Sequence, residues 1–380
     1  MTREPHHGGP PLAETQGVLT IDLGALVANW RLLRDLSAPA KCAAVVKADA
    51  YGIGSEHAAK ALHAAGCRTF FVAQASEGVR VRAALKDMRD ARIFALNGLL
   101  PEPSVADVFV EHGLRPVLGS LDELRLWLSH TAGRRPFALH FNTGMNRLGI
   151  EIAEAEDARA MLAKSGAVPE LLMSHFVSSE VIDDPLNQKQ IDGFAKVRQV
   201  FPGIPASVAN SSGIFLGQKP YFDLVRPGYA LYGGNPTPNL SNPMRSVVKL
   251  EAPIIQLRNI EAGETVGYNA QWTARRPTRL ATIGIGYADG FPRSAMNTDS
   301  KLGAEAVIGG VICPFAGRVS MDLIVIDVTD APGDSVYIGA PVELLGEKIT
   351  VDDLGARSNT IGYEILTGLG RRYHRRYVGG

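Results

Sequence analysis

Short apolar runs alternate with amphipathic stretches in a regular rhythm between about residues 40 and 235. Each run is too short for a helix and reads as a buried strand. The intervening segments, such as SEHAAKALHAAG and LDELRLWLSHTAG, carry apolar residues at helical spacing and begin with or follow a serine, a preferred N-cap. The apolar runs are AAVVK (from Ala43), TFFVAQ (from Thr69), RIFALNG (from Arg92), RPVLGS (from Arg115), FALHFN (from Phe137), LLMSHF (from Leu171), ASVANS (from Ala206) and DLVRPG (from Asp223). Eight such strands with helical connectors predict an α/β fold with a parallel (β/α)8 barrel. The absence of GxGxxG after the first strand argues against a dinucleotide-binding sheet.

The pattern changes after GGNPTPNLSNP, residues 233–243, where Gly, Pro, Asn and Ser mark a linker. Beyond it, strand-like alternation with turns at short intervals predicts a mostly β second domain, with one helix near NTIGYEILTGLG. The basic end RRYHRRY is expected to be a solvated terminus. The expected division is therefore a disordered tail over 1–16, a barrel over 17–240 and a β domain over 241–380.

Composition narrows the possible partners. Lys plus Arg and Asp plus Glu each number 39, so no overall field favours nucleic acid or an anionic membrane. The three cysteines, Cys42, Cys67 and Cys313, lack metal-ligand spacing, which predicts a reducing compartment and no metal site. The first sixteen residues have no apolar core of a secretion signal, and no apolar run is long enough to span a bilayer. A cytoplasmic location is the resulting expectation.

The segment VVKADAYG, residues 45–52, carries the first candidate for chemistry. Lys47 ends the first predicted barrel strand, and barrel enzymes place their chemistry at the carboxyl ends of the strands. A desolvated lysine loses its proton readily and can form a Schiff base with an aldehyde cofactor. The alternative is that Lys47 points into solvent, as charged residues at strand ends usually do.

Other polar groups are predicted at the same rim of the barrel. ANSSG (209–213) and RPGYALYG (226–233) follow late strands and offer hydroxyls and backbone N–H groups for a phosphate, although each alone is also an ordinary turn. Arg226 ends the eighth strand, His175 ends the sixth, and TGMNRLG brings Arg147 after the fifth. Singly they could be a surface arginine or a core histidine, but together they favour one site.

Nine segments in order resemble the bacterial alanine racemases from about Thr20 to Tyr377: VVKADAYGIG, TGMNRLG, SHF, ANSSG, RPGYALYG, VGYNAQW, GIGYADGFPR, GRVSMD and NTIGYEIL. The resemblance implies a barrel that binds pyridoxal 5'-phosphate (PLP), followed by a β domain. It also implies interconversion of L- and D-alanine, with D-alanine used for peptidoglycan or broken down. Lys47 would hold PLP covalently and act as one base. Tyr268, from the partner subunit of a homodimer, would act as the second, because racemisation needs a proton removed from one face of Cα and another delivered to the opposite face.

The family resemblance implies further roles. Arg226 would donate to the pyridine nitrogen. Because arginine keeps its own proton, the ring nitrogen would stay unprotonated. An unprotonated ring is a weaker electron sink, which suppresses transamination. His175 would support Arg226, with Asn210 nearby. The phosphate would be held by Tyr51, Ser211, the N–H groups of Gly228 and Tyr229, and Tyr363. The substrate carboxylate would meet Arg147 and the N–H of Met321 from the partner. Asp322 would position Tyr268. The access corridor would be lined by Tyr287, Arg293 and Arg318, and Tyr287 and Tyr363 would narrow it to suit a methyl side chain.

The chain departs from the family pattern in the fifth strand. Many members have a lysine there, often carbamylated, followed two residues later by aspartate, whereas this chain has His140 and Asn142. It cannot form the carbamate that orients the arginine corresponding to Arg147. Our hypothesis is that an anion such as chloride takes its place, or that Asn142 acts as a neutral acceptor. Ser320 replaces the usual cysteine before Met321, which should not touch the two bases.

Three other functions are weighed against a racemase of alanine. PLP-dependent decarboxylases of the same layout use a glycine-rich phosphate loop and a catalytic cysteine with acidic neighbours, neither of which is evident. PLP-homeostasis proteins resemble the barrel alone and lack a second domain. Broad-spectrum racemases are usually exported. The sequence leaves open the biosynthetic or catabolic role, serine as a secondary substrate, the tightness of the dimer, and the effect of His140 and Asn142.

Overall fold

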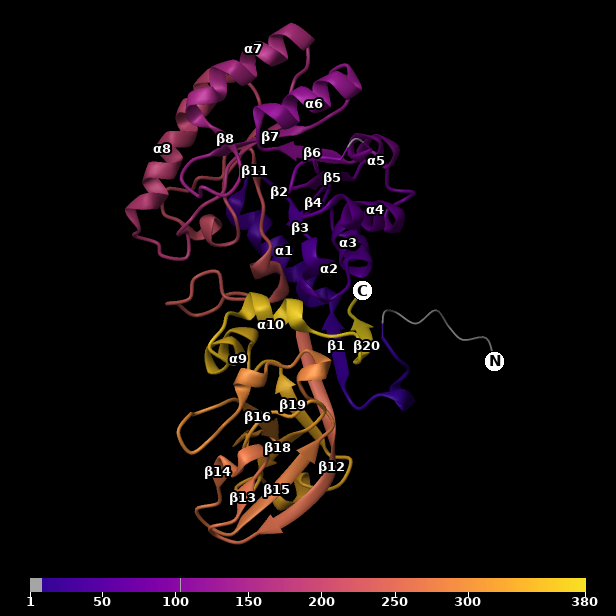
Figure 1. Cartoon of the computed structure of the whole chain (residues 1–380), viewed down its shortest axis with the longest axis vertical. Helices are drawn as coiled ribbons and strands as arrows, with labels where there is room; N and C mark the ends of the chain where they lie inside the picture. Colours follow the sequence, from indigo (N-terminus) through magenta and orange to yellow (C-terminus); the bar gives the residue numbers. More distant parts are fainter. Residues whose placement is uncertain (1–8, 103) are drawn as a thin grey trace, which may run out of the picture.

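The computed structural model describes residues 9–102 and 104–380, and the chain forms two parts (Figure 1). The first part, coloured indigo to magenta, is a barrel of short parallel strands surrounded by helices. Its strands are β2 (Lys41–Cys42), β3 (Ala44–Val45), β4 (Thr69–Val72), β5 (Arg92–Ala95), β6 (Arg115–Leu118), β7 (Ala138–Asn142), β9 (Leu171–Met173), β10 (Ala206–Ser207) and β11 (Leu224–Val225), and β8 (Ile150–Glu151) is a short addition beside β7.

The barrel is closed. Strands β3, β4, β5, β6, β7, β9 and β10 pair in that order, all in parallel. Strand β11 pairs in parallel with β2, which continues into β3 through Ala43. On its other side β11 is joined to the β10 segment, because the N–H of Asp223 donates to Ala206 at 3.0 Å and the N–H of Arg226 donates to Ala209 at 2.9 Å. With β2 and β3 counted as one strand, the predicted (β/α)8 barrel is confirmed.

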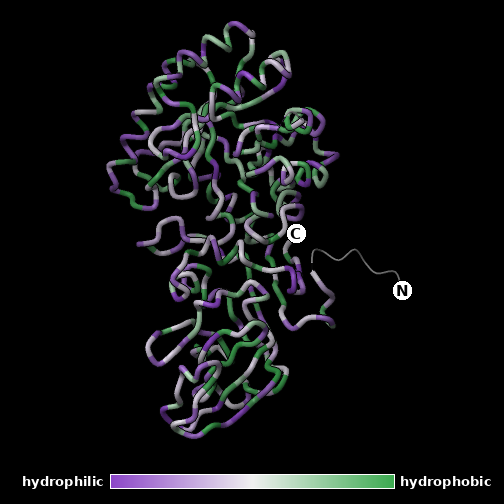
Figure 2. Tube along the Cα trace, in the orientation of Figure 1, coloured by the Kyte–Doolittle hydropathy of each residue, from purple (hydrophilic) through white to green (hydrophobic). Residues whose placement is uncertain are grey.

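The barrel helices follow the predicted amphipathic segments. Helix α6 begins after Ser120, whose hydroxyl accepts the N–H of Glu123, and it buries Leu124, Trp127 and Leu128 on one face. Along the outer helices the tube in Figure 2 alternates between hydrophobic and hydrophilic, whereas β4 to β7 are buried almost throughout. The helices are α1 (Leu23–Ser37), α3 (Ser55–Ala64), α4 (Ala75–Ala84), α5 (Val105–Glu111), α6 (Leu121–Thr131), α7 (Ala155–Ser165) and α8 (Pro185–Val200), and α2 (Lys47–Tyr51) is a short turn with left-handed backbone.

The second part is built on one long strand, β12 (Val248–Ile260), which pairs antiparallel with β1, β15 and β19. This confirms the mostly β character predicted for it. The other strands are β1 (Val18–Asp22), β13 (Thr265–Val266), β14 (Trp272–Thr273), β15 (Thr278–Ile283), β16 (Glu305–Ile308), β17 (Val311–Pro314), β18 (Ile324–Asp327), β19 (Pro341–Leu345) and β20 (His374–Val378), and the helices are α9 (Val351–Arg357) and α10 (Gly362–Gly368).

The two ends of the chain meet in this second sheet. Strand β1 lies between β12 and β20, so residues 18–22 belong to the sheet of the second part although they precede the barrel. Residues 12–14 form a 3-10 turn, and the hydroxyl of Thr15 donates to the carbonyl of Arg372 at 2.6 Å. The part of the expected disordered tail over 1–8 lies outside the described residues. The limits 17–240 and 241–380 stay a prediction.

The expectation that RRYHRRY is a solvated terminus is wrong. Strand β20 pairs in parallel with β1, and Tyr373 and Arg375 are buried. The guanidinium of Arg375 donates to the carbonyl of Gly52 at 2.6 Å, and the hydroxyl of Tyr377 donates to Ile53 at 2.8 Å. The end of the chain therefore supports the loop that follows Lys47.

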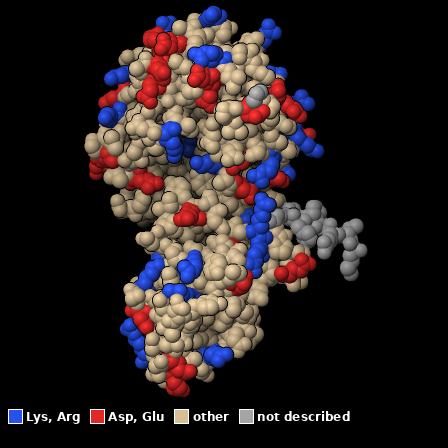
Figure 3. Space-filling model, viewed as in Figure 1, with Lys and Arg blue, Asp and Glu red and all other residues tan. Residues whose placement is uncertain are grey.

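Within the described ranges, no helix is both long and apolar enough to cross a bilayer. Basic and acidic side chains are both spread over the face shown in Figure 3, as the equal numbers of the two signs predict.

Candidate active site

Lys47 stands where β3 ends, and a left-handed turn follows it directly. Residues 48–51 all have φ between 52° and 54°, a conformation that costs L-residues roughly 1–2 kcal/mol each. The turn closes on Gly52, whose N–H donates to the carbonyl of Ala48 at 2.9 Å. Strain of this kind persists only where the surrounding structure fixes it. The backbone beside Lys47 is therefore held in one conformation.

The surroundings of Lys47 favour its neutral form. Burial lowers the pKa of Lys47 below its usual value, and the positive charge of Arg147 lowers it further, while Glu77 acts in the opposite direction. The amine thus loses its proton more readily than that of a lysine in solvent. A neutral amine is what nucleophilic attack on an aldehyde requires.

Arg226 is almost completely buried at the end of β11. Its terminal nitrogens donate to the hydroxyl of Ser207 at 2.5 Å and to the carbonyl of Ser174 at 2.6 Å, and one lies 3.5 Å from Nδ1 of His175. Burial lowers the pKa of Arg226 to about 9, so the guanidinium remains charged at neutral pH. Burial and the charge of Arg226 lower the pKa of His175 to about 3, so its ring is neutral and Nδ1 can accept from Arg226. His175 thus lies beside Arg226.

The nitrogen Nε of Arg226 takes part in none of the hydrogen bonds formed by this side chain within the described ranges. Arg226 therefore has a fixed orientation and keeps its Nε–H free. In the described residues, moreover, Lys47, Arg147 and Arg226 form no ion pair with a carboxylate. Three cations without an acidic partner fit a site for anionic groups.

The predicted phosphate loops come together beside Tyr51. The hydroxyl of Ser211 accepts the N–H groups of Gly228 at 3.0 Å and Ala230 at 3.2 Å, which joins the loop after β10 to the loop after β11. A Cβ at Gly228 would lie 2.5 Å from the hydroxyl oxygen of Tyr51, so only glycine permits this approach. The missing side chain at Gly228 thus lets the backbone of this loop lie close to the hydroxyl of Tyr51.

Aromatic rings cover this corner of the rim. Tyr363 stacks on Tyr229 with ring centroids 3.8 Å apart, and its ring centroid lies 6.2 Å from that of Tyr51. The hydroxyl of Tyr363 donates to Glu180 at 3.1 Å, and that of Tyr229 donates to Asp352 of α9 at 2.5 Å. The hydroxyl of Tyr229 is therefore already engaged, and the role expected of its N–H stays a prediction. The oxygen Oδ1 of Asn210 accepts from Ser179 at 2.9 Å and from the N–H of Gly213 at 2.8 Å, which shapes the preceding loop.

The residues that depart from the family pattern carry no negative charge. His140 is buried, and burial together with Arg226 and Arg147 lowers its pKa to about 4, so the ring is neutral at neutral pH. Asn142 accepts the N–H groups of Gly144 and Asn146 at 3.1 and 3.0 Å. Its amide donates to the side chains of Asn146 and Glu151 at 2.9 and 2.8 Å.

Both the oxygen and the nitrogen of the Asn142 amide are therefore bonded within the segment that carries Arg147, residues 142–151. The hypothesis that it is a neutral acceptor for Arg147 is wrong for this structure, and the alternative of a bound anion stays a hypothesis.

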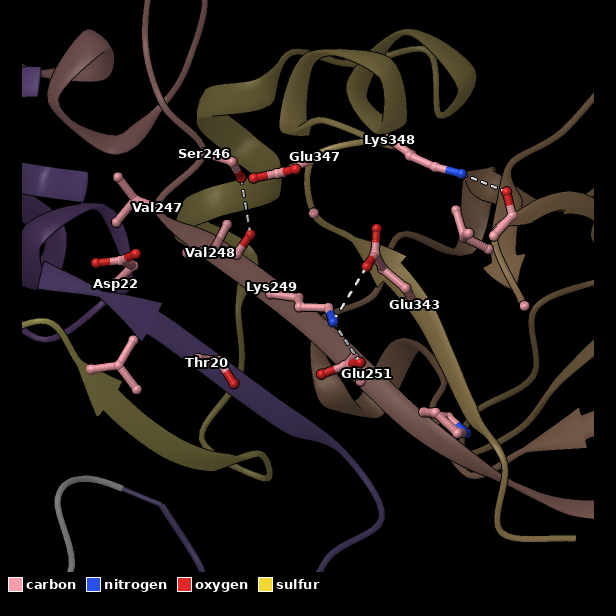
Figure 4. A pocket seen from close by; sticks show the side chains of 16 residues that line it. Thr20, Asp22, Ser246, Val247, Val248, Lys249, Glu251, Glu343, Glu347 and Lys348 are labelled. Carbon is pink, nitrogen blue, oxygen red and sulfur yellow. Dashed lines mark hydrogen bonds and ion pairs between the residues drawn. The ribbon is translucent and has the colours of Figure 1, made fainter. Parts of the chain in front are cut away.

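The pocket drawn in Figure 4 lies elsewhere, between β1, β12 and β19. It encloses about 540 Å³, and it is lined by none of the residues expected to bind the cofactor or the substrate. Its central amine, Lys249, is already paired with Glu251 at 2.8 Å and with Glu343 at 3.5 Å. This pocket is not the candidate active site.

Comparison with known proteins agrees with the geometry. The family model for the alanine racemase N-terminal domain matches residues 21–236, and the model for the C-terminal domain matches residues 247–377. The chain belongs to the alanine racemase family. It is 55% identical to an alanine racemase of Methylobacterium nodulans, over 95% of this chain and 96% of that one. It is 43% identical to a biosynthetic alanine racemase of Agrobacterium fabrum (95% and 93% covered) and 45% identical to a catabolic one of Rhizobium johnstonii (95% and 94% covered).

Solved structures of alanine racemases share the fold. That of Bartonella henselae, solved with covalently bound pyridoxal phosphate, superposes with a TM-score of 0.88 at 39% identity, and covers 96% of this chain and 99% of its own. That of Acinetobacter baumannii superposes with a TM-score of 0.87 at 34% identity, and covers 96% and 100%. The expected family is confirmed.

Of the racemase residues predicted in the second part, Tyr363 lies at the barrel rim against Tyr229, whereas the bonds that the structure describes for Asp322 and Arg318 are to residues of the second part. Tyr268 is 69% exposed, and it lies next to β13 and β14, at the far end of the second part from α2 (Figure 1). Met321 is 54% exposed, and Asp322 accepts from Arg372 at 2.9 Å. Arg318 donates to Gln271 at 2.8 Å, while Tyr287 is partly exposed and Arg293 opens a 3-10 turn. The roles expected of these residues stay predictions.

Three residues near the rim were not foreseen. Ser207 orients Arg226, Asp352 receives the hydroxyl of Tyr229, and Glu77 accepts the N–H of Ala48 at 2.7 Å. Only Glu77 left a signal in the sequence, because it stands three residues after Gln74 at the start of a helix, the spacing of a capping box. The contacts of Ser207 and Asp352 depend on the tertiary structure, which the sequence pattern does not record.

Proposed function

We propose that this protein is an alanine racemase that uses PLP to interconvert L- and D-alanine. The observation that carries the proposal is the meeting of Lys47, buried Arg226 and the Ser211–Gly228 loops at one rim of a barrel. This arrangement stands in a chain that matches both domains of the family.

The residues at the rim fit PLP. Lys47 is biased toward the neutral amine that would attach to its aldehyde. Arg226 keeps its Nε–H free for the ring nitrogen, with both terminal nitrogens held by Ser207 and Ser174. Tyr51, Ser211 and the N–H of Tyr229 would hold the phosphate, the N–H of Gly228 would turn to it from the hydroxyl of Ser211, and Tyr363 would close the corner.

When bound, PLP supplies an electron sink for the negative charge that develops at Cα of alanine. The chain supplies the proton transfers. Lys47, once released from the cofactor, would take or give a proton on one face of Cα. Tyr268 of a second subunit would act on the opposite face, because in its own chain it is exposed and stands between β13 and β14, which lie far from α2 (Figure 1). Arg147 would hold the substrate carboxylate.

A homodimer is required because the two proton-transfer groups would come from different chains. A site that needs Lys47 from one chain and Tyr268 from another works only in a homodimer, with Met321 contributed along with Tyr268. The access corridor, lined by Tyr287, Arg293 and Arg318 of that second chain, would then open toward Lys47.

Mixing two inactive variants tests the shared site. Lys47→Ala and Tyr268→Phe should each lack racemase activity. Dimers reassembled from an equal mixture should recover about a quarter of wild-type activity, because half are hybrids with one intact site of two. Wild-type protein carried through the same dissociation and reassembly is the control. Absence of activity in wild type contradicts the function, whereas an active wild type without recovery contradicts the shared site.

A further inference from the structure

Glu77, the third residue of α4, joins two loops at the rim of the barrel. Its Oε1 accepts the N–H of Ala48 at 2.7 Å, after β3. Its Oε2 accepts the N–H groups of Ala73 at 2.7 Å and Gln74 at 3.2 Å, after β4. One carboxylate thus holds the ends of two neighbouring strands together.

The bond to Ala48 acts on the peptide unit that carries Lys47. The N–H of Ala48 lies in the rigid plane that begins at Cα of Lys47. Fixing that N–H fixes the direction in which the lysine side chain leaves the backbone. The same bond meets the first of the four left-handed residues 48–51, a segment that needs outside support to persist.

Glu77 also acts on Lys47 through its charge. Its carboxylate raises the pKa of Lys47, whereas burial and the charge of Arg147 lower it. Removing this negative charge would therefore shift the titration of Lys47 to lower pH.

We propose that Glu77 is a positioning residue for Lys47, holding the lysine backbone through Ala48 and balancing the positive charge of Arg147. The inference deepens the proposed function and rests on it for the role of Lys47. Glu77 itself touches neither substrate nor cofactor in this account.

The chain contains a matched control. Glu123 is the third residue of α6 and makes the same kind of bridge between the loops after β5 and β6. Its Oε1 accepts the N–H of Leu99 at 2.7 Å and its Oε2 that of Gly119 at 2.6 Å. Glu123 is not among the charges that act on Lys47. Replacing it removes a rim bridge without touching the lysine.

The experiment compares full-length wild type with Glu77→Gln, Glu123→Gln and Glu77→Asp. Trace acetylation with acetic anhydride is measured across pH on protein freed of cofactor, with the modification of Lys47 read by peptide mass spectrometry. The kcat and KM for alanine are measured on the loaded enzymes. Glutamine keeps the size of the side chain but presents only one acceptor oxygen and no charge. Aspartate keeps the charge but is too short to bridge both loops.

For Glu77→Gln we expect the acetylation profile of Lys47 to move to lower pH, and kcat to fall about tenfold with KM little changed, since the catalytic group is misplaced. Glu123→Gln should keep the wild-type profile and a kcat within about twofold of wild type. Glu77→Asp should keep the acetylation profile close to wild type but show the loss in kcat.

A Glu77→Gln profile and kcat matching those of Glu123→Gln would overturn the inference. If Glu77→Gln does not fold, Glu77→Asp decides, because an unchanged kcat in that variant overturns it equally. Should wild type fail to racemise alanine, the proposed function fails, and the acetylation profiles still test the action of Glu77 on Lys47.

Discussion

His140 should make the protein lose stability as the pH falls. Burial and the charges of Arg226 and Arg147 lower its pKa from 6.5 to about 4 in the folded chain. Between these two values the unfolded chain binds a proton that the folded chain does not. The contribution is therefore fully present above pH 6.5 and is lost as the pH falls toward 4. With these two values the loss is about 2 kcal/mol at pH 5.

The test compares wild type with His140→Gln, which cannot titrate. The free energy of unfolding is measured with urea at pH 7.5 and pH 5, at one protein concentration and without cofactor, because binding and assembly also shift stability. Wild type should lose about 2 kcal/mol more between the two pH values than the variant. Other titrating groups cancel in this difference. Equal losses in the two proteins would refute the placement of a neutral histidine beside the two arginines.

Two further substitutions probe the loops after β10 and β11. Gly228→Ala places a methyl group 2.5 Å from the hydroxyl of Tyr51. It should lower the free energy of unfolding in urea by roughly 1–3 kcal/mol and weaken PLP binding, as measured by absorption titration. Unchanged values would show that the loop is not closely packed. Tyr229→Phe removes a hydrogen bond to the carboxylate of Asp352 and should lower the free energy of unfolding by about 1–2 kcal/mol. The control is Tyr221→Phe, which loses a local hydrogen bond to the carbonyl of Ile214. A loss no greater than that of the control would contradict a link between barrel and α9.

The barrel was predictable because its strands are buried on both faces. Each therefore appears as an uninterrupted apolar run, such as TFFV, which separates it from the amphipathic helices. The C-terminal strand was missed because its buried positions, Tyr373 and Arg375, alternate with charged ones in a segment that is basic throughout. Burial of Arg375 depends on the carbonyl of Gly52, more than 300 residues earlier in the chain, and no local pattern records such a partner.

The candidate site was predictable as a set of strand ends but not in its internal contacts. Lys47, His175 and Arg226 follow from the rule that barrel chemistry lies at the carboxyl ends of strands. The left-handed turn after Lys47 could not be foreseen, because residues 48–51 include no glycine. The bonds of Asn142 within its own loop also depend on tertiary geometry, which is why its expected role toward Arg147 was wrong.

The most direct test of the account follows purified wild type and Lys47→Ala by circular dichroism, starting in separate runs from L-alanine and from D-alanine. Wild type, yellow from bound PLP, should convert both to the same equal mixture, while Lys47→Ala should be colourless and change neither. A wild type that binds PLP but leaves both enantiomers unchanged would contradict the proposed racemase activity.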